Sequence, residues 1–156
     1  ESKVDGIELG LNGNITDKWA VSAGYTYLDS EQTDPGPSCS RTGVCSPNNP
    51  AKGKDLPNVP TNSATLWTTY KVLPQLTLGA GAIAMDKVYG NAANTKWVPG
   101  YVRYDAMVRY DVNKNINLQL NVNNLSDTRY FTKAYASHFA TETEGRSAVV
   151  ALNFKY

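Results

Sequence analysis

Apolar and polar residues alternate along most of this 156-residue chain. From Ile7 onward, every second residue is apolar at Leu9 and Leu11, and glycine, glutamate or asparagine lies between them. A period of two is typical of a β-strand with one apolar face. The pattern recurs and predicts seven antiparallel strands, at about 7–15, 19–27, 61–72, 76–84, 102–112, 116–122 and 148–156. Only the Thr- and Ser-rich stretch 61–72 leaves open which of its residues share a face.

The predicted strands are about ten residues long, which favours a membrane-spanning barrel over a soluble domain. Strands in soluble proteins average about five or six residues, whereas a tilted strand of about 9–11 residues crosses the hydrocarbon of a bilayer. Alternation by itself fits both arrangements. In a soluble sandwich the apolar face forms the core, and in a membrane barrel it contacts lipid while the polar face lines the lumen.

The connections between the predicted strands alternate between short and long. Tight turns are expected at 16–18, 73–75 and 113–115, and long loops at 31–57, 86–100 and 126–145. Up-and-down membrane barrels have short periplasmic turns and long extracellular loops, so this pattern favours the barrel. Aromatic residues fall at both strand ends, as in the two aromatic girdles of such barrels: Trp19, Tyr70, Tyr110 and Tyr156 at the short-turn end, and Tyr27 with Tyr101 or Tyr104 at the long-loop end.

Seven strands do not close comfortably into a barrel, and single-chain bacterial barrels have even strand numbers. An open sheet edge is not tolerated in hydrocarbon. We therefore expect residues 1–156 to form the C-terminal portion of a larger barrel, whose other strands come from upstream sequence or from a separate chain.

Composition excludes several classes of protein. The chain is 41% apolar and 19% charged with a net charge of +1, which gives no electrostatic signal for nucleic acid. Its mean hydropathy is −0.42, and the longest uncharged, mostly apolar run, 72–85, is interrupted by Pro74 and Gln75. A transmembrane helix, which needs about 20 apolar residues, is therefore not expected.

The two cysteines, Cys39 and Cys45, lie close together in a Pro-, Ser-, Gly- and Asn-rich stretch. Their spacing is not that of a CxxC redox motif. They could be free thiols in a cytosolic loop, but a small disulfide ring formed in an oxidising compartment fits this context better.

No catalytic motif is present, and the single histidine, His138, gives little support to a catalytic or metal site. We expect no enzyme activity and no protein-bound metal. The charged residues Arg103, Asp105, Arg109 and Asp111 share one face of the strand at 102–112. An acid–base site is conceivable there, but a ladder of structural ion pairs facing the lumen is the better interpretation.

Several segments carry a family resemblance: "AVSAGYTYLDSE", "LPNVPTNSATLWTTY", "LTLGAGA", "VPGYVRYDAMVRYDVNKNINLQLNVNNLSDTRYF" and "GRSAVVALNFKY". In this order they resemble the C-terminal part of a TonB-dependent outer-membrane siderophore receptor, in particular the catecholate type. The most specific piece is 121–130, with the pattern N-x-x-N-L-x-D-x-x-Y. The final strand, ending in Phe154 and Tyr156, also resembles the signal that the barrel-assembly machinery recognises.

The resemblance implies an all-β transmembrane barrel of about 22 strands, plugged by an N-terminal domain, in the outer membrane of a Gram-negative bacterium. It implies a receptor that binds a ferric siderophore at the cell surface and imports it by TonB-dependent active transport. The partners would be the siderophore, outer-membrane lipid, the plug and the rest of the barrel, and TonB through a part that is absent from these residues. Iron would arrive bound to its siderophore, so no cofactor is implied.

A ferric catecholate is anionic and aromatic, so its contacts are expected among basic and aromatic residues of the long loops. The candidates are Tyr89, Lys96, Trp97, Arg129, Tyr130, Phe131, Tyr135 and His138. The alternative is that these aromatic side chains pack on one another, and Arg129 and Tyr130 fall in the family-like segment, where a structural role is equally in keeping.

Three other functions remain open at this stage. A passive porin or structural barrel would have no plug. A secreted β-sandwich that binds a ligand would bury its apolar face and dissolve without detergent. An outer-membrane hydrolase would need a nucleophile and an acid beside His138.

Overall fold

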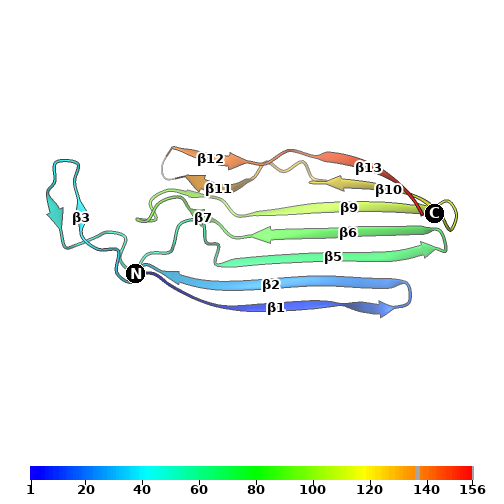
Figure 1. Cartoon of the computed structure of the whole chain (residues 1–156), viewed down its shortest axis with the longest axis horizontal. Coiled ribbons are helices and arrows are strands. Elements are labelled where there is room, and N and C mark those ends of the chain that lie inside the picture. The colour runs from blue at the N-terminus through cyan, green and yellow to red at the C-terminus, as the bar shows by residue number, and fades with distance from the viewer. Residues whose placement is uncertain (136–137, 156) are drawn as a thin grey trace.

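The computed structural model describes residues 1–135 and 138–155, and in this part of the chain all regular structure is β. Seven long strands form one antiparallel sheet in the order β1-β2-β5-β6-β9-β10-β13 (Figure 1). The strands are β1 (Lys3–Thr16), β2 (Trp19–Glu31), β5 (Asn62–Leu73), β6 (Leu76–Met85), β9 (Tyr101–Asp111), β10 (Ile116–Asn123) and β13 (Ser147–Phe154). The seven predicted strands are confirmed. The described residues include no helix that is long and apolar enough to cross a membrane.

Strand order follows chain order, as expected for an up-and-down meander. The three tight turns lie at the end of the sheet drawn on the right of Figure 1, and the long connections lie at the other end. The long connections contain three small hairpins that the sequence did not predict. They pair β3 (Ser38–Cys39) with β4 (Cys45–Ser46), β7 (Val88–Tyr89) with β8 (Trp97–Val98), and β11 (Phe131–Tyr135) with β12 (Phe139–Glu142).

The strand register confirms that the sheet has two chemically different faces. Residues directly opposite each other in an antiparallel pair lie on the same face. One face carries apolar pairs such as Leu9 with Tyr25 and Leu118 with Leu152. The other carries polar pairs such as Gln119 with Arg109. The register also settles the strand that the sequence left ambiguous, because Leu66 is opposite Ala23 and therefore lies on the apolar face.

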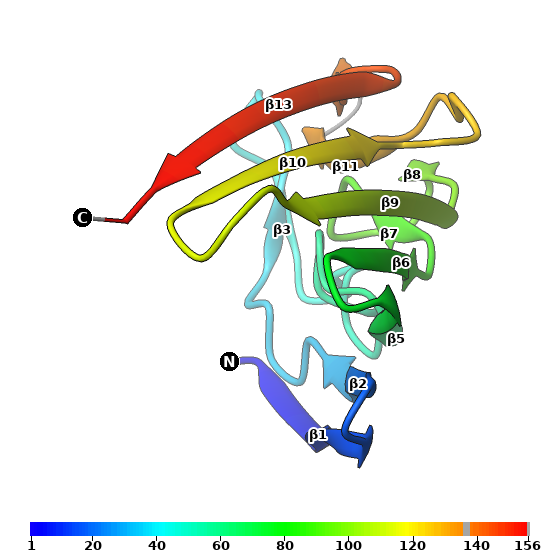
Figure 2. The same cartoon turned by 90° about the vertical axis from the view of Figure 1, so that its right-hand side faces the viewer.

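The apolar face is exposed and has no second layer packed on it among the described residues. Leu9 is 62% exposed, Val108 41% and Leu152 54%. Figure 2, which looks at the sheet from its tight-turn end, shows a single curved layer running from β1 to β13. A soluble sandwich would bury these side chains against a second sheet, so the structure contradicts that alternative. Tyr156, a predicted girdle residue, lies outside the described residues.

The polar face carries the large aromatic side chain of Trp67, which lies over two glycines of the neighbouring strand. A Cβ atom added to Gly81 would lie 2.3 Å from Cε3 of the Trp67 ring, and one added to Gly79 would lie 3.0 Å from Cζ2. Trp67 therefore fills the space that side chains at these two positions would occupy. Packing an aromatic ring over a strand glycine compensates for the side chain that the glycine lacks.

Cys39 and Cys45 form the predicted disulfide within the β3–β4 hairpin. This hairpin projects away from the sheet in Figure 1. Replacing both cysteines by serine should therefore destabilise the hairpin alone, by about 2 kcal/mol on the chain-entropy model. We expect faster proteolysis between residues 36 and 50 and an unchanged unfolding midpoint of the barrel, measured with denaturant in detergent. A lower midpoint would show that the disulfide also supports the sheet.

Candidate functional site

The buried apolar side chains of the described chain lie in the long connections and not in the long strands. Val88 of β7, Val98 of β8 and Ala134 of β11 form one cluster, with the half-buried Phe131 and Ala140 packed against it. The β7–β8 and β11–β12 hairpins are thereby joined into one packed unit, although about 40 residues separate them in the chain. We call the described residues of 32–61, 86–100 and 124–146 the loop assembly.

Two asparagines connect the three parts of the loop assembly. The carboxamide of Asn58 donates to the carbonyl of Ala134 (3.0 Å) and accepts from its N–H (2.9 Å). Asn94 makes the same two-point contact with the backbone of Asp55, at 3.0 and 2.8 Å. Both residues adopt a left-handed backbone conformation, with φ of 60° and 54°, which asparagine tolerates better than most residues. The long connections are therefore held in fixed relative positions.

An open hollow between the two packed hairpins brings several candidate residues together. It has a volume of about 270 Å³ and is lined by Lys96, Trp97, Val98, Ala134, His138, Phe139 and Ala140. Trp97 is 59% exposed and Phe139 is 67% exposed. The Phe139 ring stacks on Tyr135, with centroids 5.0 Å apart. Tyr89 is directly opposite Trp97 in the β7–β8 pair, so it lies on the same face of that hairpin.

Three other candidates are engaged in contacts within the protein. Tyr130 is 5% exposed, its ring lies 4.1 Å from that of Tyr101, and its hydroxyl accepts a hydrogen bond from Arg103 at 3.2 Å. Phe131 packs against the Val88 cluster. Arg129 forms an exposed ion pair with Glu142. The hydrogen bond that Arg129 donates to this carboxylate raises the pKa of Arg129 above its usual value. All three residues stabilise the loop assembly. Tyr130 and Phe131 offer little surface to a ligand, whereas Arg129 stays exposed with its charge paired to Glu142.

The charged residues of β9 form ion pairs two residues apart on the polar face. Arg103 pairs with Asp105 at 2.6 Å, and Arg109 pairs with Asp111 at 2.9 Å. Asp105 also accepts a hydrogen bond from the N–H of Asn124 at 2.8 Å. The sequence predicted ion pairs among these four residues, and the structure contains two of them; that they line the lumen stays a prediction.

The family-like segment 121–130 comprises the end of β10 and the compact turn that follows it. Asn124, which is 1% exposed, uses its carboxamide to bind both the N–H and the carbonyl of Thr128, each at 2.9 Å. Asp127 accepts from the N–H of Arg146 at 2.7 Å, which fixes the approach to β13. The pattern in the sequence thus corresponds to side chains that shape a turn. The described residues contain no cluster of three His, Cys, Asp or Glu side chains able to hold a metal.

Comparison with known proteins places this architecture in a family. Residues 1–125 match the family model described as "TonB dependent receptor-like, beta-barrel". The chain belongs to this family. TonB-dependent receptor barrels lie in the outer membrane of Gram-negative bacteria, and the sheet is accordingly a section of an outer-membrane barrel whose apolar face contacts lipid.

Two TonB-dependent receptors among the relatives illustrate the similarity. The chain is 74% identical over its whole length to the probable TonB-dependent siderophore receptor PiuA of Acinetobacter baumannii, of which it covers 21%. The crystal structure of PiuA superimposes on 99% of the chain with a TM-score of 0.92, and the chain covers 22% of that structure.

The catecholate siderophore receptor Fiu of Escherichia coli is 33% identical over 83% of the chain, which covers 16% of Fiu. The closed crystal form of Fiu superimposes on 98% of the chain with a TM-score of 0.79 and 28% identity, and the chain covers 21% of that structure. The chain thus spans about a fifth of the length of these relatives.

Proposed function

We propose that this chain forms the C-terminal portion of the barrel of an outer-membrane receptor, which binds a ferric siderophore at the cell surface and imports it by TonB-dependent active transport. The similarity to PiuA and Fiu supports this function. The plug, the other strands and the contact with TonB would belong to parts outside these 156 residues. Relatives that are receptors also favour transport over catalysis.

The observation that carries the proposal is the hollow between the β7–β8 and β11–β12 hairpins. It combines a cation, Lys96, with the exposed rings of Trp97 and Phe139. A ferric catecholate offers negative charge to the ammonium group and aromatic rings to the side chains. Because siderophore oxygens already coordinate the iron, the hollow needs no protein ligand for the metal.

The loop assembly supports this function because it holds the hollow in shape before a ligand arrives. The contacts of Asn58 and Asn94 and the buried Val88 cluster fix the hairpins relative to each other. A preformed site loses less conformational entropy on binding than a flexible one. Arg103, Asp105, Arg109 and Asp111 would face the plug or water in the lumen.

Trp97→Ala in the full-length receptor is expected to weaken binding of the iron complex of a synthetic tris-catecholate by roughly tenfold, because one stacking surface is lost. Lys96→Gln should weaken it by a similar factor, and more at low salt than at high salt. Titration followed by intrinsic fluorescence measures both values. Trp19→Ala is the matched control, since Trp19 lies at the tight-turn end of the sheet and should leave affinity unchanged.

A neutral ferric tris-hydroxamate tests the ligand class in the same titration. Binding as tight as that of the catecholate would argue against a site selective for anionic aromatic chelates. Uptake that rises linearly with concentration and persists without TonB would identify a passive pore and contradict active transport.

A further inference from the structure

A second hollow lies on the apolar face of the sheet, at the end that carries the long connections. Its volume is about 390 Å³, and its lining includes Tyr25, Ala64, Ala84 and Val102. These four residues are directly opposite one another across successive strand pairs, Tyr25 with Ala64, Ala64 with Ala84, and Ala84 with Val102. They therefore form one row on the face that contacts lipid. The hollow is separate from the proposed siderophore site.

The floor of this hollow is low because its residues are small. Ala64 and Ala84 contribute only methyl groups, and Gly100 contributes no side chain at all. A Cβ atom at Gly100 would lie 2.6 Å from the carbonyl oxygen of Met85, so the close approach of the residue before β9 to the end of β6 requires glycine there. The larger Tyr25 and Val102 stand at the two ends of the row, and the volume lies within the roughly 300–1,000 Å³ of small-ligand pockets.

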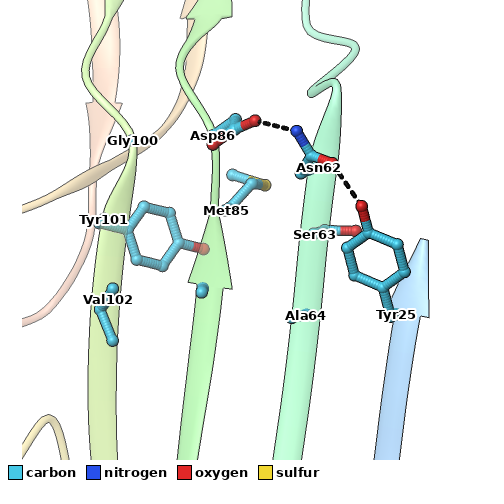
Figure 3. Close-up of a pocket in the computed structure, with 10 residues that line it drawn as sticks. Tyr25, Asn62, Ser63, Ala64, Met85, Asp86, Gly100, Tyr101 and Val102 are labelled. Carbon is cyan, nitrogen blue, oxygen red and sulfur yellow. Dashed lines mark hydrogen bonds between the residues drawn. The ribbon is translucent and has the colours of Figure 1, made fainter. Parts of the chain in front are cut away.

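Polar side chains line the rim of the hollow nearest the long connections. The Tyr25 hydroxyl donates to Oδ1 of Asn62 at 2.6 Å, and Nδ2 of Asn62 donates to Oδ2 of Asp86 at 2.6 Å (Figure 3). Tyr25 donates to Asn62 and Asn62 donates to Asp86, so the chain of hydrogen bonds ends on Asp86. Oδ1 of Asp86 and the hydroxyl oxygen of Tyr25 are therefore left as acceptors. No ion pair among the described residues uses Asp86. The neighbouring Lys87 instead lies over the Tyr89 ring, 4.9 Å from its centroid.

An apolar floor beneath a rim of acceptors fits an amphiphile whose head group supplies donors. We propose that this hollow binds one glycolipid of the outer leaflet, with an acyl chain on Ala64 and Ala84. A sugar hydroxyl or amide N–H of the head group donates to Asp86 and to the Tyr25 oxygen. A phosphate placed at the rim would meet the unpaired carboxylate of Asp86 and be repelled. The long-connection end of an outer-membrane barrel faces the cell exterior, which places the rim at the level of the outer head groups.

Native mass spectrometry of the full-length receptor, released from detergent, tests this site. The receptor is offered equal amounts of an N-acylated diglucosamine lipid, phosphatidylglycerol and phosphatidylethanolamine with matched chains. We expect one glycolipid to be retained in preference to both phospholipids. Ala84→Phe, which fills the hollow, should lower the retained fraction about tenfold, and Asp86→Asn should lower it by a similar factor because it removes the charge that strengthens the hydrogen bond.

The matched control is Ala106→Phe, which lies on the same apolar face opposite Ala80 and outside the hollow. It should leave glycolipid retention unchanged. Equal retention of all three lipids, or equal loss in Ala84→Phe and Ala106→Phe, would mean that only unselective annular lipid is present and would overturn the proposal. Preference for phosphatidylethanolamine would overturn the glycolipid assignment. Ala84→Phe should bind the ferric catecholate normally, so this test is independent of siderophore binding.

Discussion

Replacing Asp105 with alanine is expected to destabilise the barrel by about 3–5 kcal/mol, because it leaves a partly buried cation without its partner. Asp105 accepts from Nη2 of Arg103 at 2.6 Å, from Nε of Arg103 at 3.1 Å and from the N–H of Asn124 at 2.8 Å. The side chains of Arg103 and Asp105 are only 27% and 13% exposed. Asp105→Ala removes all three of these hydrogen bonds at once. It leaves the N–H of the buried Asn124 without its acceptor.

The ion pair of Arg109 with Asp111 provides the matched control, since it has the same spacing on the same strand. Its side chains are 40% and 34% exposed, so Asp111→Ala should change the free energy of unfolding by less than about 1 kcal/mol. Denaturant unfolding of the full-length receptor in detergent measures both variants. Asp105→Asn should fall between them, because the amide oxygen can still accept from Asn124. Equal losses for Asp105→Ala and Asp111→Ala would contradict the importance of burial.

Gly81→Ala is expected to destabilise the barrel by about 1–3 kcal/mol, although it adds a single methyl group. The new Cβ would lie 2.3 Å from the Trp67 ring and 2.8 Å from the carbonyl oxygen of Leu66. The Trp67 ring would have to leave its contact with Gly79, and the backbone carbonyl of Leu66 cannot move without disturbing the β5–β6 pairing. The expected result is a lower unfolding midpoint and a smaller fraction of folded barrel. The folded fraction is measured from the band whose mobility on gels changes on heating.

Gly13→Ala is the matched control for this substitution, because nothing lies within 4 Å of a Cβ at that position. It should be neutral. The double variant Gly81→Ala with Trp67→Leu should recover part of the loss by removing the ring. A Gly81→Ala receptor as stable as the wild type would show that Trp67 is free to leave its place over the glycines.

The candidate site shows where prediction from sequence stops. Lys96, Trp97 and His138 were expected in ligand-binding loops, and the structure places all three around one hollow. Tyr130 and Phe131 have equally suitable side chains, yet Tyr130 is buried against Tyr101 and Phe131 packs on the Val88 cluster. Composition does not separate these two groups, because an aromatic ring serves a ligand and a core equally well.

The residues that hold the loops in place gave no recognisable signal in the sequence. Asn58 contacts Ala134, 76 positions away, and Asn94 contacts Asp55, 39 positions away. Asparagines in loops are common, and nothing in the neighbouring residues marks these two as left-handed. The small hairpins were missed for a related reason, since strands of two to five residues are too short to show a clear period.

The sequence by itself determined the seven long strands, the alternating faces of six of them and the positions of the turns. Side-chain direction alternates within each strand, so a lipid-facing surface must appear as a local period of two. The tertiary structure alone decided the facing of Trp67, the joining of the three long connections and the location of both hollows. Those features depend on pairing between residues far apart in the chain, and a local pattern carries no record of such pairing.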